Sequence, residues 1–262
     1  MIKKIKHPEN QLKNPNVVFF HVPPIDHTQI IQIIKHKLEN QISTWILTLN
    51  WHMVSKCFTS KNYLNLILEA DLVCADGQPI VWLSKFSKPK LNTTIIGYYL
   101  TEEILKVFND IPIAIIGGTN KEKISNYLTV LGHKNIFLWT DKYDGSAKQK
   151  DFLYNQLIAN KIQIVFVGLG VPKQDDFCAY LKSHKYSGVF IGVGGSFDIL
   201  TSQMRKIPIW AHKNGLAWFF RLIRDPRHLL IRYLAFYPIG LILFLLNLAT
   251  SIFKKKHDPF NS

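Results

Sequence analysis

Cysteine is scarce in this sequence of 262 residues, with only Cys57, Cys74 and Cys178. Their number is odd and no two have CxxC spacing, which excludes a disulfide framework or a structural zinc site as the organising element. The first eleven residues, MIKKIKHPENQ, have no apolar stretch after their lysines. We therefore expect no secretory signal and a catalytic surface in the cytosol.

Motifs of several common enzyme classes are also missing. No HExxH or paired-histidine spacing indicates a metal site, no GxSxG indicates a hydrolase nucleophile, and no Walker A loop is present. The turns after Gly168 and Gly192 lack the third glycine of a dinucleotide fingerprint, because Lys173 and Phe197 stand there. No DxD pair is available to hold a divalent ion against a nucleotide-sugar pyrophosphate. A phosphate-bearing ligand would have its charge met by backbone amides, helix dipoles and basic side chains.

Acidic residues are few, 18 against 32 lysines and arginines, which gives a net charge of +14. Residues 204–262 hold ten basic and two acidic residues, and they include the most apolar run of the chain, 234–253. A basic stretch beside an apolar run and a lysine cluster predicts contact with anionic lipid head groups. Nucleic acid is not expected as a partner, because no aromatic-basic pattern or recognition helix accompanies the charge.

The run 234–253 is barely long enough to cross a bilayer, and Pro238, Gly240 and Asn247 interrupt it. Positive charge flanks both ends, so the positive-inside rule gives no orientation. We favour a helix that lies in one leaflet, with a true span as the second interpretation. A buried terminal helix is the third, and the lysines at its end argue against it.

Apolar strand-like runs alternate with helical patterns along most of the chain. The pattern predicts strands at 17–20, 45–49, 71–74, 111–116, 136–139, 162–167 and 188–193, and helices at 28–38, 64–69, 149–159 and in the segments that end near 131 and 181. Such alternation predicts a Rossmann-like α/β fold, a mostly parallel sheet with helices on both faces. We divide the chain into a flexible arm (1–16), an α/β core (17–203) and a basic, apolar appendage (204–262).

Unusual residues gather where the predicted strands end, which is where ligands bind in parallel α/β sheets. They are Asn50, Asp76, Gly117-Gly118, Gly168 to Gly170 and Gly194-Gly195. Glycine turns that open helices suit a phosphate, although strand-to-helix turns often contain glycine for other reasons. In GLGVPKQ, Pro172 suits the start of a helix, and Lys173 and Gln174 would then face the strand ends. Asp76 can serve as a general base or as the N-cap of the next helix, and spacing alone favours the N-cap.

Several blocks in this order resemble the WecG/TagA/CpsF family of bacterial glycosyltransferases. The blocks are Thr48-Leu49-Asn50, Ala70-Asp71-Leu72-Val73 with Asp76-Gly77, Ile115-Ile116-Gly117-Gly118, Val167 to Asp175, Ile191 to Asp198, Arg205 to Trp210, Gly215 to Trp218, Arg221-Leu222 and Asp225-Pro226-Arg227. The resemblance runs from about residue 17 to residue 233. The combination is highly specific, although each block alone is weak.

The resemblance implies an inverting, metal-independent transfer of an N-acetylhexosaminyl residue, often N-acetylmannosamine or its uronic acid, from a UDP-sugar. It implies a polyprenyl-diphosphate-linked sugar as acceptor at the cytoplasmic face of the cytoplasmic membrane, and no cofactor. Asp76 matches the proposed catalytic base, and Thr48 and Asn50 match polar residues of the same pocket. The candidate substrate-binding residues are Gly117, Gly118, Thr119, Gly168, Gly170, Pro172, Lys173, Gln174, Gly194, Gly195, Phe197, Asp198, Arg205, Arg221 and Arg224. The appendage matches a membrane-docking segment, and a homo-oligomer is possible.

The chain departs from the family pattern at a few positions. Thr94 stands where an arginine usually precedes the glycine matched by Gly97, and Tyr99 stands where an acidic residue is common. Asp175 replaces the glutamate of PKQE, Ala217 replaces that of GLEW, and Lys206-Ile207 adds a residue before Pro208. The missing arginine leaves a second hypothesis open, a catalytically weakened homologue that binds polyprenyl-linked glycans or acts as a scaffold. A basic nucleic-acid-binding protein is the third.

Overall fold

The structure is a computed structural model that describes residues 16–17, 20–84, 91, 94–204, 206–224, 238, 242 and 245. Its centre is a six-stranded sheet in which every pair of neighbouring strands is parallel. The strands, in the spatial order β4-β3-β8-β7-β5-β6, are β4 (Leu72–Ala75), β3 (Thr44–Leu49), β8 (Val189–Gly192), β7 (Ile164–Gly168), β5 (Ile113–Gly117) and β6 (Ile136–Trp139). The prediction of an α/β fold with a parallel sheet is therefore confirmed.

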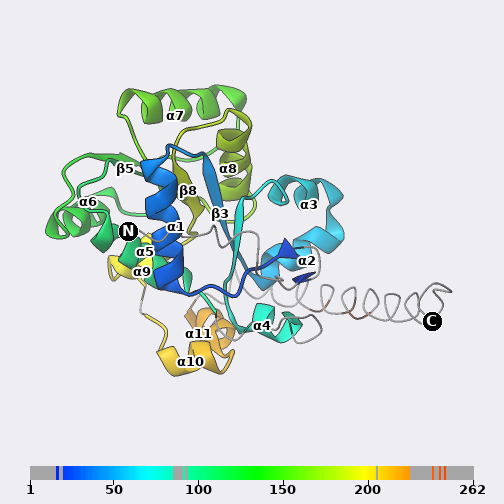
Figure 1. Cartoon of the computed structure of the whole chain (residues 1–262). Coiled ribbons are helices and arrows are strands. Elements are labelled where there is room, and N and C mark those ends of the chain that lie inside the picture. Colours follow the sequence, from blue (N-terminus) through cyan, green and yellow to red (C-terminus); the bar gives the residue numbers. More distant parts are fainter. Residues whose placement is uncertain are drawn as a thin grey trace, which may run out of the picture.

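Helices cover both faces of the sheet because the strand residues are apolar on both sides (Figure 1). The helices are α1 (His27–Glu39), α2 (Trp51–Thr59), α3 (Lys61–Ile67), α4 (Gln78–Ser84), α5 (Gly97–Val107), α6 (Lys121–Val130), α7 (Ala147–Ala159), α8 (Lys173–Ser183), α9 (Ser196–Leu200), α10 (Ile209–Lys213) and α11 (Ala217–Arg224). On β3, Trp45 and Leu47 pack in one core cluster with α2, α3, α7 and α8. Ile46 points the other way, into a second cluster with α1, α5, α6 and α9.

The predicted strand at 17–20 is wrong as a strand of this sheet. The structure has two short strands there, β1 (Asn16–Val17) and β2 (Phe20–His21), which pair with each other in antiparallel fashion. Pro23 and Pro24 follow β2 after a single residue, and proline has no N–H to donate to a strand ladder. The side chain of Phe20 still packs in the core. The apolar pattern therefore predicted the burial of this residue correctly and its strand partner incorrectly.

A crevice is expected where the chain connections diverge, between β5 and β7. The chain leaves β5 for its neighbour β6 on one side, and it leaves β7 for its neighbour β8 on the other. The order β6-β5-β7-β8 therefore corresponds to the 2-1-3-4 order of doubly wound sheets, whose ligand binds between strands 1 and 3. It differs from the 3-2-1-4-5-6 order of dinucleotide-binding sheets.

The helices α10 and α11, in the described part of the appendage, lie beside α4 at the lower end of the molecule in Figure 1, and the start of the appendage also contacts α5. A Cβ atom at Gly215 would lie 2.4 Å from the Trp82 ring of α4, so that ring rests directly on the glycine. Ile207 is buried, and Tyr98 of α5 donates a hydrogen bond of 3.4 Å to its carbonyl oxygen. These contacts attach the beginning of the appendage to the two helices that follow Asp76.

Within the described residues, no helix combines the length and apolarity needed to cross a membrane. The predicted membrane helix at 234–253 lies outside the described residues except for positions 238, 242 and 245. The predicted arm at 1–16 also lies outside them except for residue 16.

Candidate active site

Asp76 follows β4 directly and lies at the carboxyl edge of the sheet. Its backbone N–H donates to the carbonyl oxygen of Leu49 at 2.8 Å, and it forms a parallel bridge with Ile95. A Cβ atom at Gly97 would lie 4.0 Å from Asp76 Oδ2 and 3.9 Å from Ser196 Oγ, which brings three distant segments together. Helix α4 begins at Gln78, so the position directly before it belongs to Gly77, and Asp76 stands one residue too early in the chain to be the N-cap.

Thr48 and Asn50 both have structural partners at this edge. The Thr48 hydroxyl is buried and donates to the Gly192 carbonyl oxygen at 2.8 Å, which ties β3 to β8. The Asn50 side-chain oxygen Oδ1 accepts from the Met53 N–H at 3.2 Å and caps α2. Both residues therefore shape the strand ends around Asp76.

Three glycine turns touch one another between β5, β7 and β8. A Cβ atom at Gly117 would lie 2.6 Å from the backbone of Gly168, and one at Gly168 would lie 2.9 Å from the Gly194 oxygen. Gly117 also has a φ of +112°, a conformation that side chains other than glycine rarely adopt. Only glycine at these positions lets the three backbones come so close.

The crevice between β5 and β7 contains a polar pocket of about 210 Å³. It is lined by Gly117, Gly118, Thr119, Thr140, Asp141, Tyr143, Gly168, Leu169, Lys173 and Asp198. Asp198 accepts hydrogen bonds from the Thr119 N–H at 3.0 Å and hydroxyl at 2.7 Å, so its carboxylate holds the β5–α6 turn. This is the place where backbone N–H groups can meet a phosphate.

The residues of GLGVPKQ divide between the pocket and the interior. Lys173 lines the pocket, and its amine donates to the Tyr143 carbonyl oxygen at 3.2 Å. Gln174 is buried, and its side-chain oxygen accepts from the Gly194 N–H at 3.0 Å. Gln174 therefore holds the β8–α9 turn through its side chain. The sequence had predicted that this side chain would contact the substrate. Pro172 stands immediately before α8, and a Cβ atom at Gly170, which has a φ of +74°, would meet no atom within 4 Å.

Phe197 was expected to contact substrate, but its ring is 1% exposed and packs edge-on against Phe166 at 5.7 Å. It belongs to the core beneath the site, in the cluster that also contains Phe166 and Leu200. Gly195 is the N-cap of α9. Arg205 lies outside the described residues, while Arg221 and Arg224 belong to α11.

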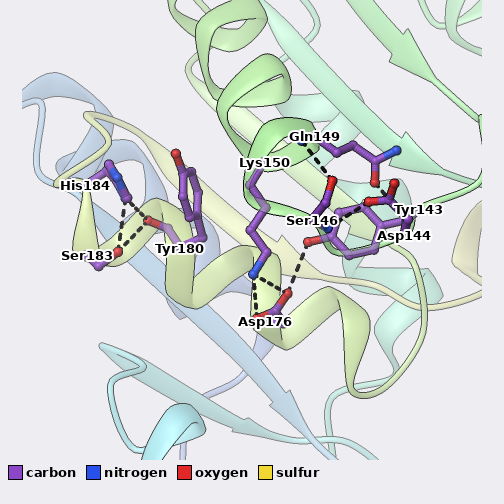
Figure 2. Close-up of polar contacts among 9 residues, drawn as sticks. All are labelled: Tyr143, Asp144, Ser146, Gln149, Lys150, Asp176, Tyr180, Ser183 and His184. Atoms are coloured by element: carbon purple, nitrogen blue, oxygen red, sulfur yellow. Dashed lines mark hydrogen bonds and ion pairs between the residues drawn. The ribbon is translucent and has the colours of Figure 1, made fainter.

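The loop between β6 and α7 is fixed by a polar network (Figure 2). Tyr143 and Lys150 both point at Asp176: the phenol donates at 3.2 Å, and the amine forms an ion pair at 2.7 Å. Burial, followed by the charge of Asp176, holds the pKa of Tyr143 well above its usual range, so the phenol remains a donor. Gln149 also donates to the Lys142 carbonyl oxygen at 3.1 Å. The wall of the pocket is thus preorganised.

The three cysteines are free and buried. Burial raises the pKa of Cys57 and of Cys74 to about 12, so these thiols are not poised as nucleophiles. Within the described parts of the chain, no three His, Cys, Asp or Glu side chains are grouped so that they could hold a metal ion.

Asp175 is a fully buried carboxyl group beside the site, and it accepts a 2.7 Å hydrogen bond from the Tyr63 hydroxyl. Burial raises its pKa to about 7, against about 3.9 in an unfolded chain. Between pH 4 and pH 7 the folded protein therefore keeps the Asp175 proton that the unfolded chain releases. The free energy of unfolding falls as pH rises from about 4 to 7. The loss is on the order of 4 kcal/mol.

We expect Asp175→Asn to flatten this pH dependence, so that the variant gains stability relative to wild type from pH 4 to pH 8. Urea unfolding across this range measures the difference. Tyr63→Phe is the companion variant, because it removes the hydrogen bond that lowers the pKa of Asp175. The pKa of Asp175 should then rise further, and the free energy of unfolding should keep falling to a higher pH. An Asp175→Asn variant destabilised equally at pH 5 and pH 8 would contradict the assignment.

Sequence reasoning missed Thr140, Asp141, Tyr143 and Ser196. Thr140 and Asp141 directly follow the apolar run 136–139, so the same strand-end rule that selected Asp76 could have found them. Tyr143 and Ser196 carry no comparable local signal, because their role depends on contacts with distant segments.

Comparisons with known proteins place the chain among glycosyltransferases. Residues 16–257 match the family described as "Glycosyl transferase WecG/TagA/CpsF family". A relative from Bacillus subtilis (strain 168) is 27% identical over 194 residues, and the aligned region covers 73% of this chain and 76% of the relative. A relative from Staphylococcus aureus (strain MW2), 28% identical over 207 residues, covers 75% of this chain and 79% of its own length. Both are named N-acetylglucosaminyldiphosphoundecaprenol N-acetyl-beta-D-mannosaminyltransferase. Because the family match spans most of the sequence, the chain is a glycosyltransferase that belongs to the WecG/TagA/CpsF family.

Proposed function

We propose that this enzyme transfers an N-acetylhexosamine-type sugar, N-acetylmannosamine or its uronic acid, from a UDP-sugar to a polyprenyl-diphosphate-linked acceptor. The product would enter cell-surface polysaccharide biosynthesis. The observation that carries the proposal is the placement of Asp76 and of the glycine-lined pocket on one carboxyl edge of the sheet. The names of the relatives, which specify the acceptor and the sugar, support it.

The site has room for the parts of a nucleotide-sugar in order. The pocket lies between β5 and β7, and Asp76 follows β4. Three inter-strand spacings separate β7 from β4, about 14 Å, a distance that a diphosphate and a sugar ring together cover. The turn of Gly194 and Gly195 lies between them, after β8. A diphosphate held over these turns would direct its sugar toward Asp76.

Asp76 would act as the general base of a single displacement. Its carboxylate accepts the proton of the acceptor hydroxyl while that oxygen forms a bond to the anomeric carbon. The bond from the anomeric carbon to the diphosphate oxygen breaks, UDP leaves with the electron pair, and the configuration inverts. The backbone N–H groups of the glycine turns and the Lys173 amine meet the charge on the leaving diphosphate. No metal is assigned to this step.

The test is UDP release from a panel of UDP-N-acetylhexosamines, with a polyprenyl-diphosphate-linked GlcNAc acceptor in liposomes. We expect release with one donor only, dependent on the acceptor and unchanged by EDTA. Release that EDTA abolishes would contradict the metal-independent mechanism. Absence of release with every donor, from a folded protein, would contradict the transferase assignment for this substrate class.

A membrane surface is the proposed location of the reaction, at the cytoplasmic face of the cytoplasmic membrane. The described helices α10 and α11 present large apolar side chains to solvent, namely Ile209, Trp210, Trp218, Phe219 and Ile223, each at least 42% exposed. Such a patch next to a basic segment is typical of interfacial binding. The patch would hold the site beside an acceptor whose lipid stays in the bilayer.

We expect Trp218→Glu with Phe219→Glu to reduce co-sedimentation with anionic liposomes by about tenfold or more, because two apolar anchors are replaced by negative charge. Val130→Glu is the matched control, since Val130 is an exposed apolar residue on α6. Equal loss in the control would show a charge effect without an anchoring surface.

A catalytically weakened, glycan-binding homologue is the second candidate, and one observation favours it. Thr94, which replaces the family's arginine, immediately precedes Ile95, the residue that bridges to Asp76. The missing cation would therefore have stood beside the proposed base. Lipid-acceptor binding without sugar transfer would support this candidate.

A further inference from the structure

Asp141 lies on the wall of the pocket that faces the β5–α6 glycine turn. The parallel register of β5 and β6 ends with the pair Ile116 and Trp139. If this register is extended by two residues on each strand, Asp141 lies opposite Gly118, one inter-strand spacing or about 4.8 Å away. Both residues line the same pocket, which agrees with that register.

The carboxylate of Asp141 is the pocket's unused acceptor. In the part of the chain that the structure describes, it makes no hydrogen bond or ion pair, and the residue is exposed. The pocket's other carboxylate, Asp198, is engaged by Thr119, and the Lys173 amine is engaged by the Tyr143 carbonyl oxygen. An ionised carboxylate only accepts hydrogen bonds, so it would repel a phosphate and attract hydroxyl donors.

The surrounding βαβ unit, β5-α6-β6, gives that acceptor a specific ligand group. In dinucleotide-binding βαβ units, a glycine turn after the first strand takes a diphosphate, and an acidic residue roughly 20 residues later, at the end of the second strand, accepts from ribose hydroxyls. The unit β5-α6-β6 shares this strand, turn, helix and strand order but has Gly117-Gly118-Thr119 in place of the GxGxxG spacing. Asp141 stands at that place relative to Gly118. The loop that carries it is held by Tyr143 and Gln149, so the backbone beside Asp141 is fixed before any ligand arrives.

We propose that Asp141 is a specificity-determining residue that accepts hydrogen bonds from the ribose hydroxyls of the donor nucleotide. The ribose then lies at the β6 side, the diphosphate over the glycine turns of β5 and β7, and the sugar toward Asp76 after β4. This inference rests on the proposed nucleotide donor and extends it to the part of the nucleotide that is recognised. It assigns to Asp141 no role in the chemical step.

Calorimetric titration with UDP and with 2′,3′-dideoxy-UDP tests the inference without turnover. We expect wild type to bind UDP about tenfold or more tightly than the dideoxy analogue, the usual effect of hydrogen bonds to a charged group. Asp141→Ala should bind UDP about tenfold more weakly and should no longer distinguish the two ligands. Glu122→Gln is the control, because Glu122 is an exposed carboxylate of the same βαβ unit that does not line the pocket.

The outcomes separate this inference from the proposed donor. Preserved preference for UDP in Asp141→Ala would overturn it, as would equal binding of both ligands by wild type. If wild type binds neither ligand, the nucleotide donor itself fails and the inference fails with it. Thermal unfolding midpoints within about 2 °C of wild type would show that the variants are folded, as expected for an exposed side chain.

Discussion

Replacement of Asp76 by asparagine is expected to lower kcat for sugar transfer by about 10²- to 10⁴-fold, the usual contribution of a general base. The amide has nearly the same shape as the carboxylate but cannot take the proton of the acceptor hydroxyl. KM for the donor should change little, because the nucleotide pocket lies three strands away. Initial rates of UDP release with the acceptor present measure both parameters.

Asp110→Asn is the control for this prediction. Asp110 is an exposed aspartate that precedes β5, at the amino edge of the sheet, so the same chemical change is made far from the site. Equal losses in the two variants, or unchanged kcat in Asp76→Asn, would remove Asp76 from the mechanism while leaving the enzyme class intact.

Gly117→Ala should destabilise the fold by about 3 kcal/mol or more. The new Cβ atom would meet the Gly168 backbone at 2.6 Å, and backbone atoms cannot turn away as a flexible side chain would. The φ of +112° adds strain of about 1–3 kcal/mol for any residue with a Cβ atom. Urea unfolding measures the loss, and nucleotide binding should weaken with it because the same turn lines the pocket.

Gly170→Ala separates backbone strain from close contact. Gly170 also has a positive φ, +74°, but a Cβ atom there would meet nothing within 4 Å. Its substitution should therefore cost only about 1–2 kcal/mol, the strain alone. Equal destabilisation of the two variants would show that the close approach of the Gly168 backbone to Gly117 adds no cost beyond backbone strain.

The sheet could be predicted from the sequence because a doubly covered parallel strand is a continuous apolar run. Helices α2 and α5 were not predicted. Asn50, the N-cap of α2, was assigned to the active site, although its side chain serves the helix start. Helix α5 begins at Gly97-Tyr98-Tyr99 after an Ile96 cap that makes no side-chain hydrogen bond, so the usual start signals are missing.

Only those site residues that directly follow a strand could be predicted from the sequence. Asp76 and the three glycine turns follow apolar runs, and the structure brings the glycine turns into contact. The order of the strands decides that Asp76 and Ser196 both lie near Gly97 and that Asp198 holds Thr119. Periodicity carries no information about strand order. The inward direction of Gln174 likewise depends on how α8 docks against β8.

The most direct test of the central claim is the mass of the acceptor lipid after incubation with wild type and each UDP-N-acetylhexosamine. We predict a polyprenyl-diphosphate-GlcNAc that is heavier by one N-acetylhexosamine residue with one donor only. An acceptor lipid of unchanged mass with every donor, from folded protein that still binds the lipid, would contradict the claim.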